Sequence, residues 1–197
     1  LLFIYMIQNT IWWIEYAQIQ GLKIDFYSNI PKVIIDNFNS SIQNEYPGLT
    51  VIGESLFFDK SDVGLLQQNP QLKMINNSGS TMPSLLDFPL KNSIISSLTS
   101  ESGMNNLYQN LGKDYLYPDP KNMCIFIDNQ NTKRCFSLLK NNFNHWKMAQ
   151  AFLLFNRGIP QILYGTEVLM SDSLSLGKNT QVLSDFPGGW NHDKKDA

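Results

Sequence analysis

Two carboxylates, Asp25 and Glu54, each follow a short strand-like run, and 29 positions separate them. The runs are Gly21–Ile24 and Thr50–Gly53, and the stretch between them has helical spacing of apolar residues. A strand, a helix and a strand of this length form a βαβ unit with parallel strands, so both carboxylates emerge at the same end. Neighbouring strands lie about 4.8 Å apart. That spacing suits two carboxyl groups that cleave a glycosidic bond from a separation of about 5 Å.

Two further strand-like runs, Cys124–Asn129 and Gln161–Glu167, also end in polar residues. Apolar strands with reactive side chains at their carboxyl ends are typical of the catalytic rim of a (β/α)8 barrel. With another strand over residues 84–90, the sequence predicts strands alternating with helices, and therefore an α/β fold. An open five-stranded sheet has the same pattern. A chain that starts in a helix and ends in a loop favours the second half of a barrel.

Helices are predicted where apolar residues recur every three or four positions. Residues 1–17 show this pattern, and the helix that begins at Pro31 is expected to bury Ile35, Phe38, Ile42 and Tyr46. Residues 137–157 form the clearest helix, which Gly158 and Pro160 stop. The polar stretch 55–82 is expected to be a long loop, and the last strand is expected over residues 162–164.

Composition excludes several classes of function. Hydrophobic residues make up 43% of the chain, which indicates a folded globular protein. The net charge is -2 with no basic cluster, so no nucleic-acid partner is expected. The apolar N-terminal stretch has no basic region before it and is interrupted by polar residues, so no membrane segment is expected. Cys124 and Cys135 have no metal-binding spacing, and Cys124 is expected to pack in the core.

Three short motifs at the strand ends resemble the conserved regions of a known family. They are Gly21-Leu-Lys-Ile-Asp25, Gly53-Glu54 and Phe126-Ile-Asp-Asn-Gln-Asn-Thr-Lys-Arg134. They are similar to the G-x-R-x-D, G-E and N-H-D motifs of the α-amylase superfamily, glycoside hydrolase family 13, especially its neopullulanase and cyclomaltodextrinase branch. Further similar stretches follow in the family's order: residues 8–15, 82–89, 117–120, 158–167 and 185–190.

The resemblance implies that the fold is a partial (β/α)8 TIM barrel, approximately strands four to eight. Residues 1–197 are then a fragment of one catalytic barrel domain that lacks the N-terminal half of the barrel and the C-terminal β-domain. In the family's retaining mechanism Asp25 matches the nucleophile and Glu54 the general acid/base, and Asn131 takes the place of the third carboxylate. The expected substrate-binding residues are Lys23, Tyr27, Asn129 and Gln130, and no metal-binding residue is expected.

Three positions depart from the family pattern. Asn131 carries an amide where the family has a carboxylate, so it has no negative charge. Gln130 replaces a histidine, and Lys23 replaces an arginine, which keeps the charge but loses the planar fork. Asp128 lies three residues before Asn131, about 10 Å away along an extended strand, so it is not expected to substitute.

These departures leave two hypotheses open. The chain is part of a retaining glycoside hydrolase that acts on α-1,4-glucans, maltooligosaccharides or cyclodextrins, or it is an inactive relative that binds glucan without hydrolysing it. The expected partner in both is an α-glucan. No cofactor is expected in the fragment, whereas the resemblance allows calcium and a homo-oligomer in the full-length protein. The sequence leaves the location open, and the resemblance suggests a periplasmic or secreted protein.

Two aromatic residues are expected near the site. Tyr27 lies two positions after Asp25, and Trp190 follows a Pro-Gly-Gly run, so both are candidates for stacking on a sugar ring. Trp12 and Trp13 lie on the first predicted helix and are expected to pack. His145 and His192 have no ligand spacing and are interpreted as structural or surface residues.

Overall fold

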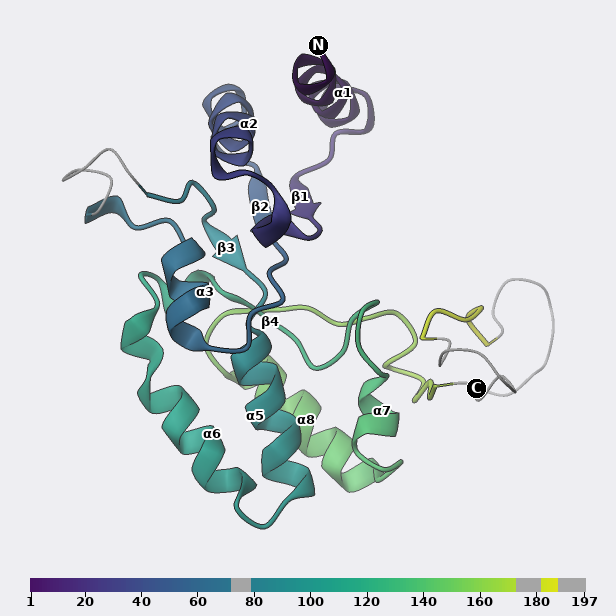
Figure 1. The fold of residues 1–197 in the computed structure, drawn as a ribbon. Coiled ribbons are helices and arrows are strands. Elements are labelled where there is room, and N and C mark those ends of the chain that lie inside the picture. The colour runs from purple at the N-terminus through teal and green to yellow at the C-terminus, as the bar shows by residue number, and fades with distance from the viewer. Residues whose placement is uncertain (72–78, 173–181, 188–197) are drawn as a thin grey trace. The chain divides into compact units, whose positions relative to one another are not determined.

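The computed structural model describes residues 1–71, 79–172 and 182–187. Helices and strands alternate along much of this chain (Figure 1). The chain divides into two compact units. Unit 1 contains residues 1–89 and 113–124, and unit 2 contains residues 90–112 together with those from 125 onward.

Unit 1 is built on a parallel sheet of three strands in the order β1-β2-β3. Its elements are α1 (Leu2–Ala17), β1 (Gly21–Ile24), η1 (Tyr27–Asn29), α2 (Lys32–Glu45), β2 (Thr50–Gly53), α3 (Lys60–Leu66), β3 (Ser84–Leu85), η2 (Asp114–Leu116) and η3 (Pro120–Asn122). A parallel bridge between Leu86 and Cys124 continues the pairing beyond β3. The predicted βαβ unit is confirmed, because β1 and β2 are parallel neighbours joined through α2.

The core of unit 1 lies between the sheet and its helices. Its buried members are Tyr27, Ile35, Val51, Val63, Met82, Leu85, Tyr117 and Met123. The stripe predicted on α2 is confirmed at Ile35 and Ile42, and Phe38 packs against the core as a partly buried residue. Since these side chains come from the sheet, from α2, from α3 and from the segment before β4, the core ties distant parts of the sequence together.

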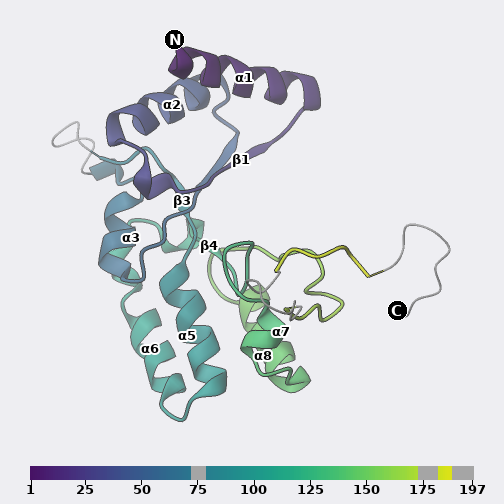
Figure 2. The same cartoon turned by 45° about the vertical axis from the view of Figure 1, so that its right-hand side comes forward.

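α1 contacts α2, and the two helices lie side by side in both views (Figures 1 and 2). Of the apolar stripe predicted on this helix, only Ile14 is buried. Trp12 and Trp13, which are expected to pack, are 51% and 47% exposed. Trp12 stacks on Tyr16 of the same helix, with 4.7 Å between ring centroids. The helix ends at Ala17, its C-cap Gln18 has a left-handed backbone, and Gly21 starts β1.

Unit 2 is mainly helical. Its elements are most of α5 (Phe88–Thr99), α6 (Gly103–Gly112), the second residue of β4 (Cys124–Ile125), α7 (Cys135–Leu138), α8 (Phe143–Phe155) and β5 (Ile159–Pro160). α5 and α6 lie side by side in both views (Figures 1 and 2). The buried core residues are Leu90, Ile94, Leu107, Ile125, Ile127, Cys135, Leu139, Ala149 and Leu153. Cys135 is a buried free thiol in this core, and Cys124 of unit 1 is buried as expected.

Several predicted elements differ from the observed ones. The expected loop 55–82 contains α3, which starts where the Asp59 side chain accepts a hydrogen bond from the Ser61 backbone. The expected helix 137–157 is interrupted between α7 and α8, because Lys140 and Asn141 have positive φ angles of 57° and 55°. Asn142 then caps α8 through its side chain. A side-chain cap resets the helix start in a way that apolar periodicity does not show.

The last differences concern strands and one helix. β3 covers only Ser84–Leu85, and α5 begins at Phe88, so the last three residues of the predicted strand 84–90 are helical. The strand expected at residues 162–164 lies earlier, at Ile159–Pro160. α6 occupies a stretch for which no helix was predicted. Within the described part of the chain, no helix is long and apolar enough to cross a membrane.

Gly53 offers a test of how tightly β2 is packed. A Cβ at this position would lie 2.9 Å from Leu85 and 3.1 Å from both Met82 and Tyr27. Because overpacking a buried site costs about 1–3 kcal/mol, Gly53→Ala is expected to lower the free energy of unfolding by that amount. Urea unfolding followed by circular dichroism measures it.

Gly48→Ala is the matched control, because nothing lies within 4 Å of a Cβ at Gly48. This variant is expected to unfold like the native protein. Equal stability of the two variants would show that β2 is not packed as described.

Candidate active site

Asp25 and Glu54 lie at matching positions of two neighbouring strands. In the β1–β2 register Ile24 pairs with Gly53, so the next residue on each strand is a carboxylate. The backbone ladder continues past the strands, because the Glu54 N–H donates to the Ile24 carbonyl at 2.8 Å and the Tyr27 N–H donates to the Glu54 carbonyl at 2.8 Å. The expectation that both carboxylates leave the sheet at the same end is therefore confirmed.

Lys23 bridges the two carboxylates. Its ammonium group donates to Asp25 Oδ1 and, at 2.6 Å, to Glu54 Oε2. Lys23 and Asp25 are two residues apart, so an extended strand turns their side chains to the same face. The Glu54 side chain is fully buried, whereas that of Asp25 is 54% exposed. One carboxylate is thus shielded from water and the other can be reached from solution.

The contacts among these residues shift the pKa values of Asp25 and Lys23. The hydrogen bond from Lys23 lowers the pKa of the Asp25 carboxyl below its usual value; burial opposes this effect, and a hydrogen bond with Glu54 adds to it. Burial lowers the pKa of the Lys23 ammonium, but its hydrogen bonds and ion pairs with Asp25 and Glu54 outweigh this, and its pKa is raised overall. Asp25 is therefore held ionised, which is the state that a nucleophilic carboxylate needs.

Phe26 and Tyr27 follow Asp25 and have contrasting environments. Phe26 has a left-handed backbone with φ of 51°, and its side chain is 50% exposed. Tyr27 is only 4% exposed and belongs to the core of unit 1. The structure therefore does not present the Tyr27 ring for stacking on a sugar. The sequence analysis did not single out Phe26 as an exposed aromatic residue beside Asp25. Its position directly after the strand end was the signal that could have indicated it.

Lys23 and Asp25 also line a cavity of about 320 Å³. Its other lining residues are apolar and come from α1, β1, α2 and the segment before α2, including Phe3, Met6 and Ile34. Asp25 thus lines a largely apolar cavity within unit 1.

Asn129, Gln130 and Asn131 lie in unit 2, whereas Lys23, Asp25, Tyr27 and Glu54 lie in unit 1. The three residues form a turn after β4. The Asn129 side chain accepts a hydrogen bond from the Asn131 backbone at 3.0 Å, and the Asn129 N–H donates to Thr132 Oγ1 at 2.9 Å. Asn129 is buried, Gln130 is half-buried and Asn131 is exposed. Of the three, the Asn131 side chain is thus the most accessible.

Asp128 has a structural environment. It is 3% exposed, and its Oδ2 accepts hydrogen bonds from the Cys135 backbone at 2.7 Å and from Thr166 Oγ1 at 3.3 Å. Burial raises the pKa of the Asp128 carboxyl, while these bonds and the charge of Arg134 oppose the shift. Asp128 organises the turn after β4, in line with the expectation that it does not replace the missing carboxylate.

Among the described residues, no group of three or more His, Cys, Asp or Glu side chains is placed to hold a metal ion. His145 is half-buried on α8. Trp190 and His192 lie outside the described residues.

Asp25 and Glu54 thus stand at the carboxyl ends of two adjacent parallel strands. This is the end of the strands at which (β/α)8 barrel proteins place their reacting side chains.

No family model matches the chain. The β/α-amylase of Paenibacillus polymyxa is 26% identical over 163 residues, which are 79% of this chain and 12% of that protein. The cyclomaltodextrin glucanotransferase of Niallia circulans is 28% identical and is matched over 81% of this chain and 21% of its own length. A cyclomaltodextrinase of Thermoanaerobacter pseudethanolicus is 23% identical over 84% of this chain and 27% of its own length.

Similar folds are also found among solved structures. An α-amylase from Geobacillus thermoleovorans, complexed with acarbose, has a TM-score of 0.73 and 23% identity, and the match covers 86% of this chain and 37% of that one. The cyclomaltodextrin glucanotransferase CldA has a TM-score of 0.69 and 26% identity, over 84% of this chain and 32% of the other.

The resemblance to the α-amylase superfamily, glycoside hydrolase family 13, is confirmed by relatives found through both sequence and fold. The predicted fold class, an α/β chain that forms part of a (β/α)8 barrel, is confirmed as well. The chain spans about a tenth to a quarter of the length of these curated relatives.

Replacing Lys23 tests the ion-pair bridge. Because the Lys23 ammonium lowers the pKa of Asp25, Lys23→Gln is expected to move the Asp25 titration to higher pH, and Lys23→Arg is expected to keep it low. A group whose pKa is lowered by folding stabilises the folded state above its usual pKa, and this stabilisation is lost as the pH falls through the lowered value. The variant should therefore lose less stability on acidification than the native protein.

Carboxyl ¹³C NMR of Asp25 measures the titration. Lys121→Gln, at an exposed lysine of η3, serves as the control and should change nothing. An Asp25 titration that is the same in Lys23→Gln and in the native protein would contradict the bridge.

Proposed function

We propose that this chain carries the nucleophile and the acid/base of a retaining glycoside hydrolase that acts on α-1,4-glucans, maltooligosaccharides or cyclodextrins. The observation that carries the proposal is the Asp25–Glu54 pair, set side by side by the β1–β2 register and bridged by Lys23. The chain would form one part of a single catalytic barrel domain, with the remaining strands supplied by the rest of the protein.

The reaction follows from the two carboxyl groups. Asp25 Oδ attacks the anomeric carbon and forms an ester bond to the sugar, while the protonated Glu54 gives its proton to the departing glycosidic oxygen. Glu54, now a carboxylate, takes a proton from water, and the resulting hydroxyl group replaces Asp25 at the anomeric carbon. The sugar leaves with its original configuration, and both carboxyl groups return to their starting states.

The names and ligands of the relatives support the substrate class. The relatives include an amylase, a cyclomaltodextrinase and cyclomaltodextrin glucanotransferases. Structural neighbours were solved with acarbose, maltose and maltotriose. These are α-glucan oligosaccharides or their mimics, so we infer an α-glucan as the ligand of this chain.

A second candidate function is glucan binding without turnover, and Asn131 is the observation that favours it. This exposed residue stands where the family places a third carboxylate. Removing a preorganised group that acts mainly on the transition state lowers the rate by about 10²–10³. An amide at position 131 removes the negative charge but leaves Asp25 and Glu54 unchanged, so sugar binding would persist without turnover.

Release of reducing ends from maltoheptaose separates the two functions, measured on the protein that carries this chain. The proposal predicts turnover that Asp25→Asn and Glu54→Gln each abolish, and that Asn131→Asp raises by about 10²–10³. Asn144→Asp, at an exposed asparagine on the first turn of α8, controls for added charge and should leave the rate unchanged.

Turnover that survives Asp25→Asn would contradict the assigned nucleophile. A native protein that binds maltoheptaose without cleaving it, and that gains activity in Asn131→Asp, would establish the second candidate.

A further inference from the structure

Tyr27 joins three segments that are distant in the sequence. Its backbone N–H donates to the Glu54 carbonyl at 2.8 Å. Its ring packs beneath β2, where ring Cγ would stand 3.1 Å from a Cβ on Gly53. Its hydroxyl group forms a hydrogen bond of 2.7 Å with Ser80 Oγ. Through its backbone and side chain, Tyr27 therefore contacts the end of β2 and the segment that leads into β3, two positions after Asp25.

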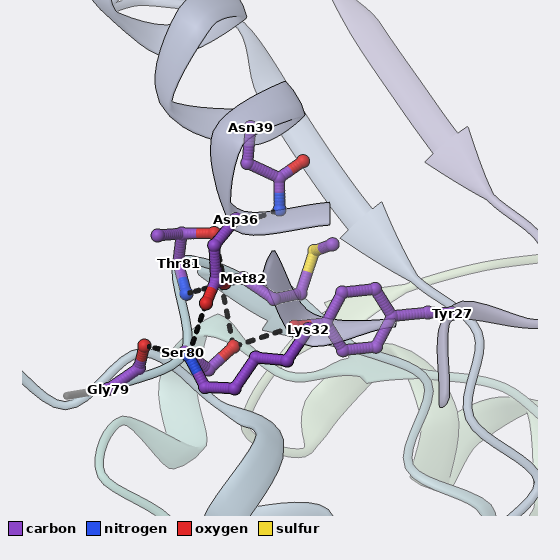
Figure 3. A network of polar contacts seen from close by, with 8 residues as sticks. All are labelled: Tyr27, Lys32, Asp36, Asn39, Gly79, Ser80, Thr81 and Met82. Atoms are coloured by element: carbon purple, nitrogen blue, oxygen red, sulfur yellow. Dashed lines mark hydrogen bonds and ion pairs between the residues drawn. The ribbon is translucent and has the colours of Figure 1, made fainter. Parts of the chain in front are cut away.

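Ser80 is itself held firmly. Its Oγ accepts a hydrogen bond from the Met82 backbone at 3.1 Å, and its neighbour Thr81 is bound to α2 (Figure 3). Asp36 Oδ1 accepts from the Thr81 N–H at 3.2 Å and from Thr81 Oγ1 at 2.9 Å. Asn39 Nδ2 donates to Thr81 Oγ1 at 3.2 Å. The serine that binds Tyr27 thus stands on a segment fixed to a helix of the same unit.

Lys32 adds a further contact between α2 and residues 79–82. Its ammonium group donates to Asp36 and, at 2.7 Å, to the Gly79 carbonyl (Figure 3). The contacts shown in Figure 3 come from one face of α2 and from residues 79–82, and they end at the Tyr27 hydroxyl group.

The turn after Asp25 needs such an anchor. Asp25 has left β1, Phe26 has the left-handed φ of 51°, and the side chains of both are about half exposed. The strand ladder sets the face on which the Asp25 side chain lies, and beyond the turn the ladder resumes at the Tyr27 N–H. Tyr27 is the first buried residue after Asp25, so it sets the end of the turn on which the carboxylate stands.

We propose that Tyr27 is a positioning residue for the Asp25–Glu54 pair, and that it acts through its hydrogen bond to Ser80. This inference rests on the proposed function. Tyr27 does not touch the substrate in this account; it holds the Asp25 carboxylate at the distance from Lys23 and Glu54 that attack on the sugar requires. A misplacement of about 1 Å at a reacting group lowers a rate by about 10²-fold.

The test uses Tyr27→Phe, Ser80→Ala and the double variant, in the protein that carries this chain. Each single variant is expected to lower kcat on maltoheptaose by about 10- to 100-fold, with KM changed less than about twofold. Both variants remove the hydrogen bond between Tyr27 and Ser80, so the double variant should lower kcat no further than the more affected single variant. Carboxyl NMR should also show Asp25 titrating at higher pH in Tyr27→Phe, since the carboxylate moves away from Lys23.

Tyr117→Phe is the matched control. Tyr117 is 3% exposed in the same core, and its hydroxyl group donates to Asp87 at 2.8 Å. This variant is expected to lose stability but to keep kcat and the Asp25 titration. If Tyr27→Phe behaves like Tyr117→Phe, Tyr27 is merely structural and the proposal is overturned.

Failure of the proposed function would be seen separately, as a native protein without turnover. In that case the Asp25 titration alone tests the proposal. If Asp25 titrates at higher pH in Tyr27→Phe but not in Tyr117→Phe, Tyr27 positions the carboxylate. If the titration is unchanged in Tyr27→Phe, the proposal is overturned. If Tyr27→Phe does not fold, the Asp25 titration is measured in Ser80→Ala and compared with that in Tyr117→Phe.

Discussion

The candidate site depends on the parallel register of β1 and β2. Because Ile24 pairs with Gly53, the next residue on each strand is a carboxylate at the same end of the sheet. A shift by one residue would turn one of the two side chains to the opposite face. Gly53 supports this register, since the close approach of Leu85, Met82 and Tyr27 leaves no room for a side chain before Glu54. The small residue of the Gly-Glu motif is thus explained by packing.

Charge then differentiates the two carboxylates. Lys23 contacts both, but Glu54 is fully buried while Asp25 is half exposed. A single cation beside an accessible carboxylate keeps it ionised, and an ionised carboxylate can attack a sugar. Lysine supplies the charge without the two parallel hydrogen bonds of arginine. Its flexible ammonium can reach both partners at once, which is the arrangement observed.

The sequence predicted the elements that carry the pair and was less successful elsewhere. β1, α2 and β2 were predicted because their apolar spacing is regular and Pro31 marks the helix start. The motifs at Asp25 and Glu54 also located the pair itself. Apolar periodicity did not reveal the caps at Asp59 and Asn142, nor the interruption between α7 and α8, because these depend on single hydrogen bonds and positive φ angles. The burial of Tyr27 could not be predicted either, since its ring packs on core residues such as Met82 and Leu85 and its hydroxyl group binds Ser80, which is 53 residues away.

The most direct test of the account is to trap the covalent intermediate. The protein is incubated with an α-glucosyl fluoride that carries a second fluorine at C5, which slows breakdown of the glycosyl ester, and its peptides are analysed by mass spectrometry. The account predicts one glucosyl adduct, on Asp25, and none in Asp25→Asn. A glucosyl adduct on any other residue, or hydrolysis with inversion at the anomeric carbon, would contradict it.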